Sequence, residues 1–253
     1  MRAEGPLILG LWSAPRSRST AFLRMMVERQ DRLVLHHPFS DISERSEANV
    51  HGRLARSEPA LIDAMRGVCH QAPIFFKDTT DAERPGLLTD RHFLGSDAVH
   101  TFLIRHPAET IPSFHALRPE VKLHQIGVQR LYDLFLAVAE ASGRTPVVLD
   151  AADLVTDPVG AVRAYCAAVG IPYLEHALSW PAGERPEWRR TRHWHRDLSR
   201  STCLAEVPTS HHNSLTATPR LQDYLDHHLP YYEKLHAHRL VPQSTAGGSD
   251  NPA

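Results

Sequence analysis

The stretch Gly10–Ala21, GLWSAPRSRSTA, decides how the rest of the chain is interpreted. It continues an apolar run, LILGLW, and it leads into AFLRMMVERQ, whose apolar residues recur at helical spacing. A strand, a tight polar turn and a helix form a common phosphate-binding arrangement, because unpaired backbone N–H groups and the helix dipole face the anion. The turn departs from the Walker A motif, since proline and arginine stand where its second glycine and its lysine belong. The sequence therefore predicts an anion site and leaves open which anion it holds.

Length and composition indicate one globular domain. The chain has 253 residues, of which 42% are hydrophobic and 23% charged, and its net charge is −1. We expect a single domain over residues 1–240 and a disordered Gly/Ser/Pro tail over 241–253. The charge balance argues against nucleic-acid or membrane partners, and no apolar run reaches the roughly 20 residues of a membrane helix. The scattered cysteines Cys69, Cys166 and Cys203 are typical of a cytoplasmic protein with reduced thiols.

Apolar runs alternate with helical patterns along the chain, which predicts βαβ units. The expected fold is three-layer α/β, with a mainly parallel central sheet flanked by helices on both faces. The predicted strands are 7–12, 33–35, 73–77, 99–104 and 146–149. The predicted helices are 19–30, 58–70, 107–117, 121–142, 158–169 and 219–240. The segment 171–218 is too polar for a core and too aromatic for a linker, so we expect a loop that closes over a ligand.

A second anion-binding signal follows the fourth predicted strand, VHTFLI. Arg105 stands at the carboxyl end of that strand, where open α/β sheets bind ligands, and Ser113 lies in the second turn of the next helix. An arginine fork and a serine hydroxyl on the same side can hold a phosphate. The first loop offers the same chemistry through Arg16, Ser17, Arg18, Ser19 and Thr20.

Together the two segments resemble the PAPS-dependent sulfotransferases. APRSRSTAF is similar to their 5′-phosphosulfate loop, usually P-K-S-G-T-T. LIRHPAETIPSF is similar to their 3′-phosphate motif, R-[DN]-P with a serine eight residues after the arginine. The likeness is greatest to a bacterial branch whose loop reads W-S-x-P-R-x-x-S-T-A and in which a later segment, W-H-x-x-[VL]-x-x-S-T, recurs. That segment stands here as WHRDLSRST, residues 194–202, so the three matches span most of the chain.

The resemblance implies a P-loop fold, related to that of P-loop NTPases, that binds 3′-phosphoadenosine-5′-phosphosulfate (PAPS) and releases adenosine 3′,5′-bisphosphate (PAP) without a metal ion. It implies that one continuous loop wraps the 5′-phosphosulfate, through Pro15, Arg16, Ser17, Arg18, Ser19 and Thr20. Arg16 takes the place of the family's lysine beside the bridging oxygen. Arg18 departs from the family, because it stands where the motif has glycine.

The second motif supplies the expected site for the 3′-phosphate. By resemblance, Arg105 and Ser113 hold this group. The segment 188–203 covers the nucleotide in this interpretation, and it offers further phosphate partners in Arg192, Ser201 and Thr202 and a tryptophan that could stack on adenine.

The general base is where the sequence departs most from the family. Many members carry a histidine two residues after a lysine on the third strand, but here Thr79 follows Lys77 at that spacing, and threonine is a poor base. Other members place a glutamate just after the second strand, and His37 stands in that place. We therefore expect His37 to act as the base, since histidine titrates near neutral pH, and Lys77 to stabilise the transferring sulfonate. The remaining candidates for the base are His36, Asp78 and Asp81.

The predicted reaction is the in-line transfer of a sulfuryl group to a hydroxyl of a small molecule. The polar segment 40–57 and the region 118–130 are the expected lining of the acceptor site, which favours a small polar alcohol or a secondary metabolite. The sequence leaves open the acceptor, a homodimer, and whether the sulfate is retained or later serves as a leaving group.

Two alternative functions remain from the sequence. A P-loop small-molecule kinase would need magnesium, for which Asp78 or Asp150 is the nearest candidate ligand. A non-catalytic nucleotide-binding protein of the same fold would explain the missing histidine after Lys77. No metal site is expected, because the 18 histidines show none of the spacings of a metal-binding motif.

Overall fold

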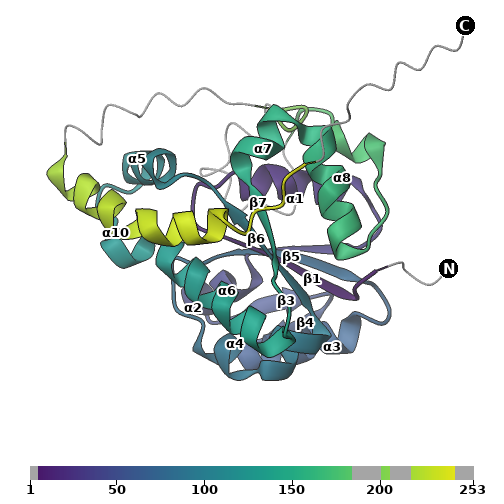
Figure 1. Ribbon diagram of the computed structural model, residues 1–253. Helices are drawn as coiled ribbons and strands as arrows, with labels where there is room; N and C mark the ends of the chain where they lie inside the picture. The colour runs from purple at the N-terminus through teal and green to yellow at the C-terminus, as the bar shows by residue number, and fades with distance from the viewer. Residues whose placement is uncertain (1–4, 184–200, 206–217, 243–253) are drawn as a thin grey trace, which may run out of the picture.

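A parallel five-stranded sheet forms the centre of the molecule (Figure 1). The computed structural model describes residues 5–183, 201–205 and 218–242. The strands follow the order β2-β5-β1-β6-β7, and every neighbouring pair is parallel. Their bounds are β1 (Ile8–Ser13), β2 (Leu33–His36), β5 (Ile74–Thr79), β6 (Val99–Ile104) and β7 (Val147–Asp150). The predicted fold class is confirmed, and each predicted strand is present.

Helices cover both faces of this sheet, which gives the three layers (Figure 1). One face is covered by α1 (Ser19–Glu28), α7 (Ala151–Thr156) and α8 (Pro158–Val169). The other face is covered by α2 (Pro38–Arg45), α3 (Glu58–Val68), α4 (Pro85–Thr89), α5 (Pro107–Leu117), α6 (Val128–Ser142) and α10 (Pro219–His236). The short elements are a π turn over Phe93–Asp97 and 3₁₀ turns over Leu123–Gln125 and Glu175–Leu178. A small antiparallel hairpin, β3 (Ala48–Val50) and β4 (Arg53–Ala55), stands apart from the main sheet.

The central strand β1 contributes to two separate hydrophobic cores, one on each face of the sheet. Ile8 and Trp12 pack with the helices α3 and α6, whereas Leu9 and Leu11 pack with α1 and α8. Successive side chains of a strand point to opposite faces, so a strand buried on both faces is apolar at every position. This explains why the run LILGLW shows no polar alternation.

Gly10 interrupts this run because there is no room for a side chain. A Cβ atom at Gly10 would lie 2.4 Å from the ring of Phe76, which is itself packed against Trp12 and Phe93. We therefore expect Gly10→Ala to lower the free energy of unfolding by about 2 kcal/mol, as overpacked cores do. Urea denaturation followed by circular dichroism measures this change.

Gly67→Ala is the matched control for that experiment. Gly67 lies within α3, and an added Cβ would meet only the end of the exposed Arg53 side chain, at 2.9 Å. That side chain can move, and alanine favours the helix by up to about 1 kcal/mol over glycine. Gly67→Ala should therefore be neutral or stabilising. Equal stability of the two variants would show that the Phe76 ring shifts and makes room for the added methyl group at residue 10.

The prediction of one long helix over residues 121–142 is wrong for the first part of this range. The chain forms a 3₁₀ turn at Leu123–Gln125, and α6 begins only at Val128. Between them, Gly127 has a φ angle of 83°, and its carbonyl accepts a hydrogen bond from Thr80 Oγ1 at 2.8 Å. The break thus attaches the start of α6 to the residues that follow β5.

The last predicted helix also ends earlier than expected, at His236 instead of residue 240. Beyond it the backbone turns and joins the edge strand of the sheet. Arg239 forms a bridge with Val148 of β7, and the N–H of Leu240 donates to the Val148 carbonyl at 2.7 Å. Pairing with the sheet replaces the final helical turn.

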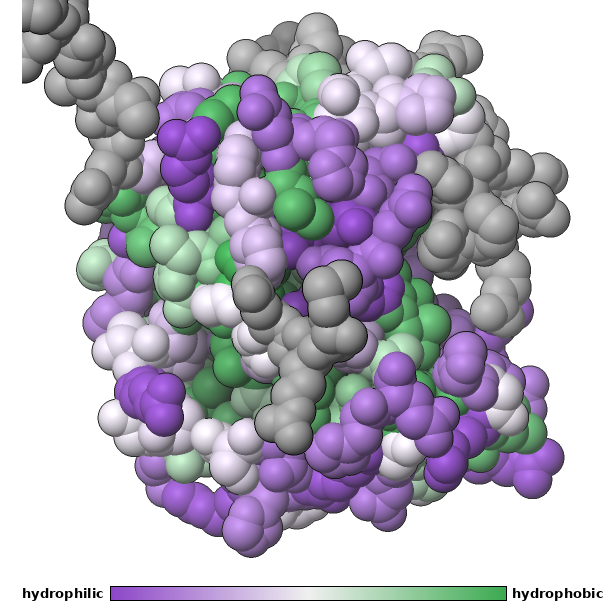
Figure 2. All heavy atoms as spheres, turned by 90° about the vertical axis from the view of Figure 1, so that its right-hand side faces the viewer, coloured by the Kyte–Doolittle hydropathy of each residue, from purple (hydrophilic) through white to green (hydrophobic). Residues whose placement is uncertain are grey.

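One face of the molecule shows how hydrophilic and hydrophobic residues are distributed over its surface (Figure 2). The face seen in Figure 2 is largely hydrophilic, and hydrophobic residues lie between hydrophilic ones. Among the described residues, no helix combines the length and the apolar character needed to cross a membrane.

Candidate active site

A cavity of about 290 Å³ opens at the carboxyl ends of β1, β5 and β6. Its wall includes the loop after β1, the start of α2, the end of β5, and parts of α5 and α7. The predicted site residues that line it are Pro15, Arg16, Ser17, Arg18, Ser19, Thr20, His37, Lys77, Arg105, Ser113 and Ser201. Residues up to 186 positions apart in the sequence, from 15 to 201, therefore meet at one edge of the sheet.

The loop after β1 turns sharply through two left-handed residues. Arg16 has a φ angle of 68° and Arg18 one of 62°, and α1 begins at the next residue, Ser19. Glycine adopts this conformation without strain, whereas other residues pay roughly 1–2 kcal/mol. The backbone at Arg18 thus has the shape that favours glycine, as the family motif has there, and the arginine accepts the strain. The N–H of Ala21 donates to the Arg18 carbonyl at 3.0 Å, whereas the N–H groups of Ser19 and Thr20 come too early in α1 for an intrahelical acceptor and can bind an anion.

Ser17 supports the interpretation of this loop as a ligand site. Its side chain is fully buried, and its hydroxyl has no hydrogen-bond partner within the described part of the chain. Buried hydroxyls are normally paired, since an unpaired one costs on the order of 1–3 kcal/mol. Because Ser17 also lines the cavity, a bound oxyanion would supply the missing acceptor.

The two predicted anion sites are in direct contact. Arg105 Nη1 donates to the carbonyl oxygen of Arg16 at 3.0 Å. Arg16 Nε in turn donates to Ser113 Oγ, also at 3.0 Å. Glu109 holds the other side of the Arg105 fork, with Oε2 at 2.7 Å from Nη2 and 3.0 Å from Nε. Glu109 was not predicted as a site residue, although its i+4 spacing from Arg105 is the usual spacing of an ion pair at the start of a helix.

His37 lies at the junction of β2 and α2, next to the predicted lysine. It is the N-cap residue of α2, with a left-handed φ of 60°, and its N–H donates to the Lys77 carbonyl at 2.8 Å. Its ring Nε2 is 2.8 Å from Lys77 Nζ, and its Nδ1 is 3.4 Å from Asp78 Oδ1. Burial lowers the pKa of Lys77 to about 8. The imidazole therefore bridges a buried carboxylate and a lysine whose positive charge is disfavoured by burial.

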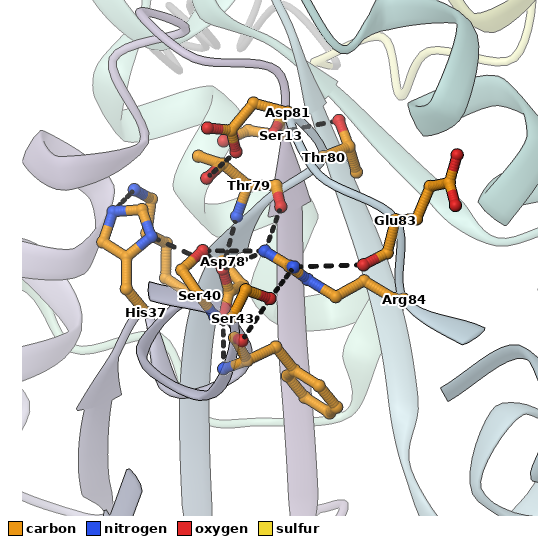
Figure 3. Close-up of polar contacts among 12 residues, drawn as sticks. Ser13, His37, Ser40, Ser43, Asp78, Thr79, Thr80, Asp81, Glu83 and Arg84 are labelled. Atoms are coloured by element: carbon orange, nitrogen blue, oxygen red, sulfur yellow. Dashed lines mark hydrogen bonds and ion pairs between the residues drawn. The ribbon is translucent and has the colours of Figure 1, made fainter. Parts of the chain in front are cut away.

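Asp78 is the centre of the polar network behind His37 (Figure 3). Its carboxylate accepts from the N–H groups of Phe39, Ser40 and Thr79 at 2.6, 3.1 and 2.8 Å and from the Ser40 hydroxyl at 2.5 Å. Burial alone would raise the pKa of Asp78, but the hydrogen bond to His37 and the charge of Arg84 hold it well below its usual range. The carboxylate is fully buried and does not line the cavity, so it fixes the start of α2 instead of reacting with a ligand.

Arg84 completes the network from the opposite side (Figure 3). Its guanidinium donates to Ser43 Oγ at 2.6 Å and to Ser40 Oγ at 2.9 Å, and it lies 3.8 Å from Asp78. The side chain is 4% exposed, so the positive charge compensates the buried carboxylate. Sequence reasoning missed Arg84, Ser40 and Ser43, because they belong to no recognisable motif.

The other candidates for the base are less well placed. His36 does not line the cavity among the described residues, although its ring centroid is 4.2 Å from that of His37. Asp81 does line it, and it accepts a hydrogen bond from Thr79 Oγ1 at 2.8 Å. His37 thus remains the histidine that faces the cavity from the predicted position.

The later predicted phosphate partners are described only in part. Arg192 and most of the segment 188–203 lie outside the described residues. Ser201 lines the cavity, whereas Thr202 is not among the lining residues, and its carbonyl accepts from the N–H of Trp180 at 2.9 Å. The expected tail over 241–253 likewise falls almost wholly outside the described part of the chain.

The two aspartates considered as magnesium ligands serve structural roles. Asp150 caps α7 through the N–H of Ala152 at 2.8 Å and accepts from the Tyr232 hydroxyl at 2.9 Å. Asp78 is enclosed as described above. Within residues 5–183, 201–205 and 218–242, no group of three or more His, Cys, Asp or Glu side chains is arranged to hold a metal ion.

Comparison with known proteins identifies the family and the fold of the chain. The family described as "Sulfotransferase domain" matches residues 7–239. Two Arabidopsis thaliana proteins, "Branched-chain-amino-acid aminotransferase-like protein 2" and "Branched-chain-amino-acid aminotransferase-like protein 1", are each 26% identical over 94% of this chain, which covers 44% and 45% of their lengths. The chain thus spans less than half of these curated relatives. The crystal structure of a sulfotransferase from Alicyclobacillus acidocaldarius has the same fold, with a TM-score of 0.52, 14% identity, and coverage of 93% of this chain and 97% of that one.

Proposed function

Because the chain belongs to the family of sulfotransferase domains, we propose that it transfers a sulfuryl group from PAPS to a hydroxyl of a small molecule. The observation that carries this proposal is that the loop 15–20, Arg105, Ser113, His37 and Lys77 line one and the same cavity. Basic and hydroxyl groups suit a donor with two separate anionic groups, and the histidine suits an acceptor hydroxyl.

The loop and the start of α1 are proposed to hold the 5′-phosphosulfate. The unpaired hydroxyl of Ser17 and the N–H groups of the first helical turn offer donors to its oxygens. Arg105 and Ser113 are proposed to hold the 3′-phosphate, and Glu109 keeps the Arg105 fork in a fixed orientation. A phosphate would share Arg105 with Glu109, whose carboxylate partly neutralises the guanidinium.

His37 and Lys77 are proposed to carry out the transfer. The acceptor oxygen forms a bond to sulfur while the bond from sulfur to the bridging oxygen of PAP breaks, and that oxygen keeps the electron pair. Lys77 Nζ moves from His37 Nε2 toward the sulfonate, because the ammonium is attracted more strongly to the negatively charged sulfonate than to the neutral imidazole. The freed Nε2 accepts the proton of the acceptor hydroxyl, and Asp78 beside Nδ1 stabilises the resulting imidazolium. Arg16 is proposed to neutralise the charge that develops on the bridging oxygen.

Calorimetric titration with PAP in the absence of metal tests the donor site. We expect binding of PAP and none of ATP with magnesium. Arg105→Ala should weaken PAP binding about 50-fold, because each charge-assisted hydrogen bond to a phosphate contributes roughly 1.5–3 kcal/mol.

Arg91→Ala is the control, because it removes the same charge from an exposed ion pair with Glu140, remote from the cavity lining. It should bind PAP as the wild type does. Binding of ATP with magnesium in place of PAP would contradict the proposed function and favour the kinase alternative.

A further inference from the structure

Arg84 is a buried arginine that has no part in the proposed mechanism. Its side chain is 4% exposed, and it is not among the residues that line the cavity. Its guanidinium donates to the hydroxyls of Ser40 and Ser43 and to the carbonyl oxygens of Thr79 and Glu83, all of which are neutral. A buried positive charge is unfavourable unless a negative charge compensates it, so the effect of this charge depends on its carboxylate partner.

Arg84 shares its carboxylate partner, Asp78, with His37. The two side chains lie on opposite sides of Asp78 (Figure 3). Arg84 Nη2 is 3.8 Å from Asp78 Oδ1, and His37 Nδ1 is 3.4 Å from the same oxygen. Ser40 Oγ fixes this arrangement, because it donates to that oxygen at 2.5 Å and accepts from Arg84 at 2.9 Å. The guanidinium and imidazole nitrogens are therefore at most about 7 Å apart, a distance at which charges interact strongly inside a protein.

Asp78 and Arg84 have opposite effects on the protonation of His37. A carboxylate beside an imidazole favours the imidazolium, and a histidine that is already protonated cannot take a proton from an alcohol. Burial raises the pKa of Asp78, but the hydrogen bond to His37 and the charge of Arg84 keep it well below its usual range, so the carboxylate stays ionised. The positive charge of Arg84 opposes a second positive charge on His37 and thus offsets the effect of the carboxylate.

Lys77 contacts the other ring nitrogen of His37, with Nζ at 2.8 Å from Nε2. In the proposed mechanism this lysine leaves the imidazole for the sulfonate, so its charge no longer acts on His37 at contact distance. Arg84 stays in place, because two hydroxyls and two backbone carbonyls hold its guanidinium. Its charge therefore still acts on His37 when the donor is bound.

Further charged and titratable groups surround His37 in the described part of the chain. They are His36 of β2, Asp41 and Glu44 of α2, Asp81 after β5, and Arg16 of the loop after β1. All of them except His36 line the cavity, where water or a bound ligand weakens their effect on His37. Asp78 and Arg84 are buried, so their charges are screened much less.

We propose that Arg84 is a positioning residue of the transfer reaction, whose fixed charge across Asp78 keeps His37 unprotonated near neutral pH and thus able to act as the base. The inference rests on the proposed function, because it takes His37 as the group that accepts the proton. It gives the buried pair a division of roles. Asp78 orients the imidazole through Nδ1, and Arg84 keeps this contact from favouring the protonated form.

The pH dependence of kcat/KM in Arg84→Gln tests this role. Turnover is measured as release of PAP from PAPS, with the most active alcohol of a screened panel. Removing the charge should move the midpoint of the acid limb upward by about one pH unit, because like charges about 7 Å apart in a protein repel by at least that much. The variant should therefore be about tenfold less active than the wild type on the acid side and equally active at higher pH, where His37 is unprotonated in both.

Two further variants separate charge from structure. Arg84→Lys keeps a positive charge and should keep the wild-type midpoint. Arg66→Gln is the matched control, because Arg66 also binds several side chains, those of Asp63, Asp90 and Asp97, and does not line the cavity. It should lower the free energy of unfolding and leave the pH profile unchanged. An unchanged profile in Arg84→Gln, or a loss of activity that is the same at every pH, would overturn the proposal.

A second comparison applies if Arg84→Gln does not fold. Asp78→Asn leaves Arg84 without its carboxylate, whereas the double variant Arg84→Gln, Asp78→Asn contains neither buried charge. The midpoint of the acid limb should lie at a higher pH in the double variant than in Asp78→Asn. Equal midpoints would mean that Arg84 does not influence the base.

Failure of the proposed function is distinguished by a measurement on the protein without substrate. A protein that neither binds PAP nor releases it from PAPS contradicts the proposed function. Protonation of His37 is then followed by NMR in the free protein, with the imidazole signal assigned by its absence in His37→Ala. A higher midpoint in Arg84→Gln than in the wild type still supports the effect of Arg84, and the same midpoint rejects it.

Discussion

His37→Ala should lower turnover more than about 100-fold and leave the affinity for PAP unchanged, since general-base catalysis contributes typically 10²–10⁴-fold. The imidazole faces the cavity and lies between Lys77 and Asp78, so its loss removes the proposed proton acceptor and leaves the proposed donor site intact. Turnover is measured as release of PAP from PAPS, with the most active alcohol of a screened panel. PAP affinity is measured by calorimetry.

His36→Ala provides the matched control, because it removes a neighbouring imidazole that does not line the cavity. Its turnover should stay within about threefold of the wild type. Unchanged turnover in His37→Ala would rule out His37 as the base, and a larger loss in His36→Ala would transfer that role to His36.

Asp78→Asn should lower the free energy of unfolding by about 3 kcal/mol at pH 7. The carboxylate is fully buried, accepts several hydrogen bonds, and compensates the buried charge of Arg84. Removing one partner of a buried ion pair leaves the other charge uncompensated and costs about 3–5 kcal/mol, of which the isosteric amide recovers a part. Urea denaturation measures the difference. Asp63→Asn is the control, because the side chain of Asp63 is 74% exposed and its replacement should cost less than about 0.5 kcal/mol.

The pH dependence of the stability difference between wild type and Asp78→Asn shows whether the variant loses a charge interaction or packing. The pKa of Asp78 is lower in the folded protein than its unfolded value of about 3.9. The carboxylate therefore stabilises the fold fully above that unfolded value, and its contribution is lost as the pH falls below about 4 through the folded pKa. The stability gap between wild type and Asp78→Asn should shrink on acidification. A gap that stays constant between pH 7 and pH 3 would mean that packing, not charge, is lost.

The elements that the sequence predicted well carry strong local signals. The helices over 107–117 and 158–169 have the expected bounds, because a proline stands at the first position of each and Gly170 ends the second with a φ of 73°. The strands are recognisable as apolar runs between polar turns. The break at Gly127 was not predictable, since the apolar spacing of residues 121–142 continues across it and the contact with Thr80 is made only in the folded chain.

The site residues differ in the same way. Those within a short sequence motif were predicted, and those joined by contacts between distant segments were not. The loop 15–20 and the pair Arg105 and Ser113 were predicted because each lies within one short motif. The network around Asp78 was not, since it depends on α2, whose sequence PFSDISER is short and polar and was not predicted as a helix. Its packing over β5 brings Ser40 to Asp78, 38 residues apart, and Arg84 to Ser40, 44 residues apart.

The central position of β1 has a consequence for how the protein is synthesised. Its two neighbours in the sheet are β5 and β6, so the first strand pairs with residues 74–79 and 99–103, and none of its pairing is local. During translation the run LILGLW has no strand partner until β5 has left the ribosome, and it gains its second partner only after β6. Parallel pairing over such separations is slow and exposes apolar surface to aggregation. Nascent chains that end before β6 should therefore depend on chaperones, and the loop after β1 takes its final shape only after both neighbouring strands have joined.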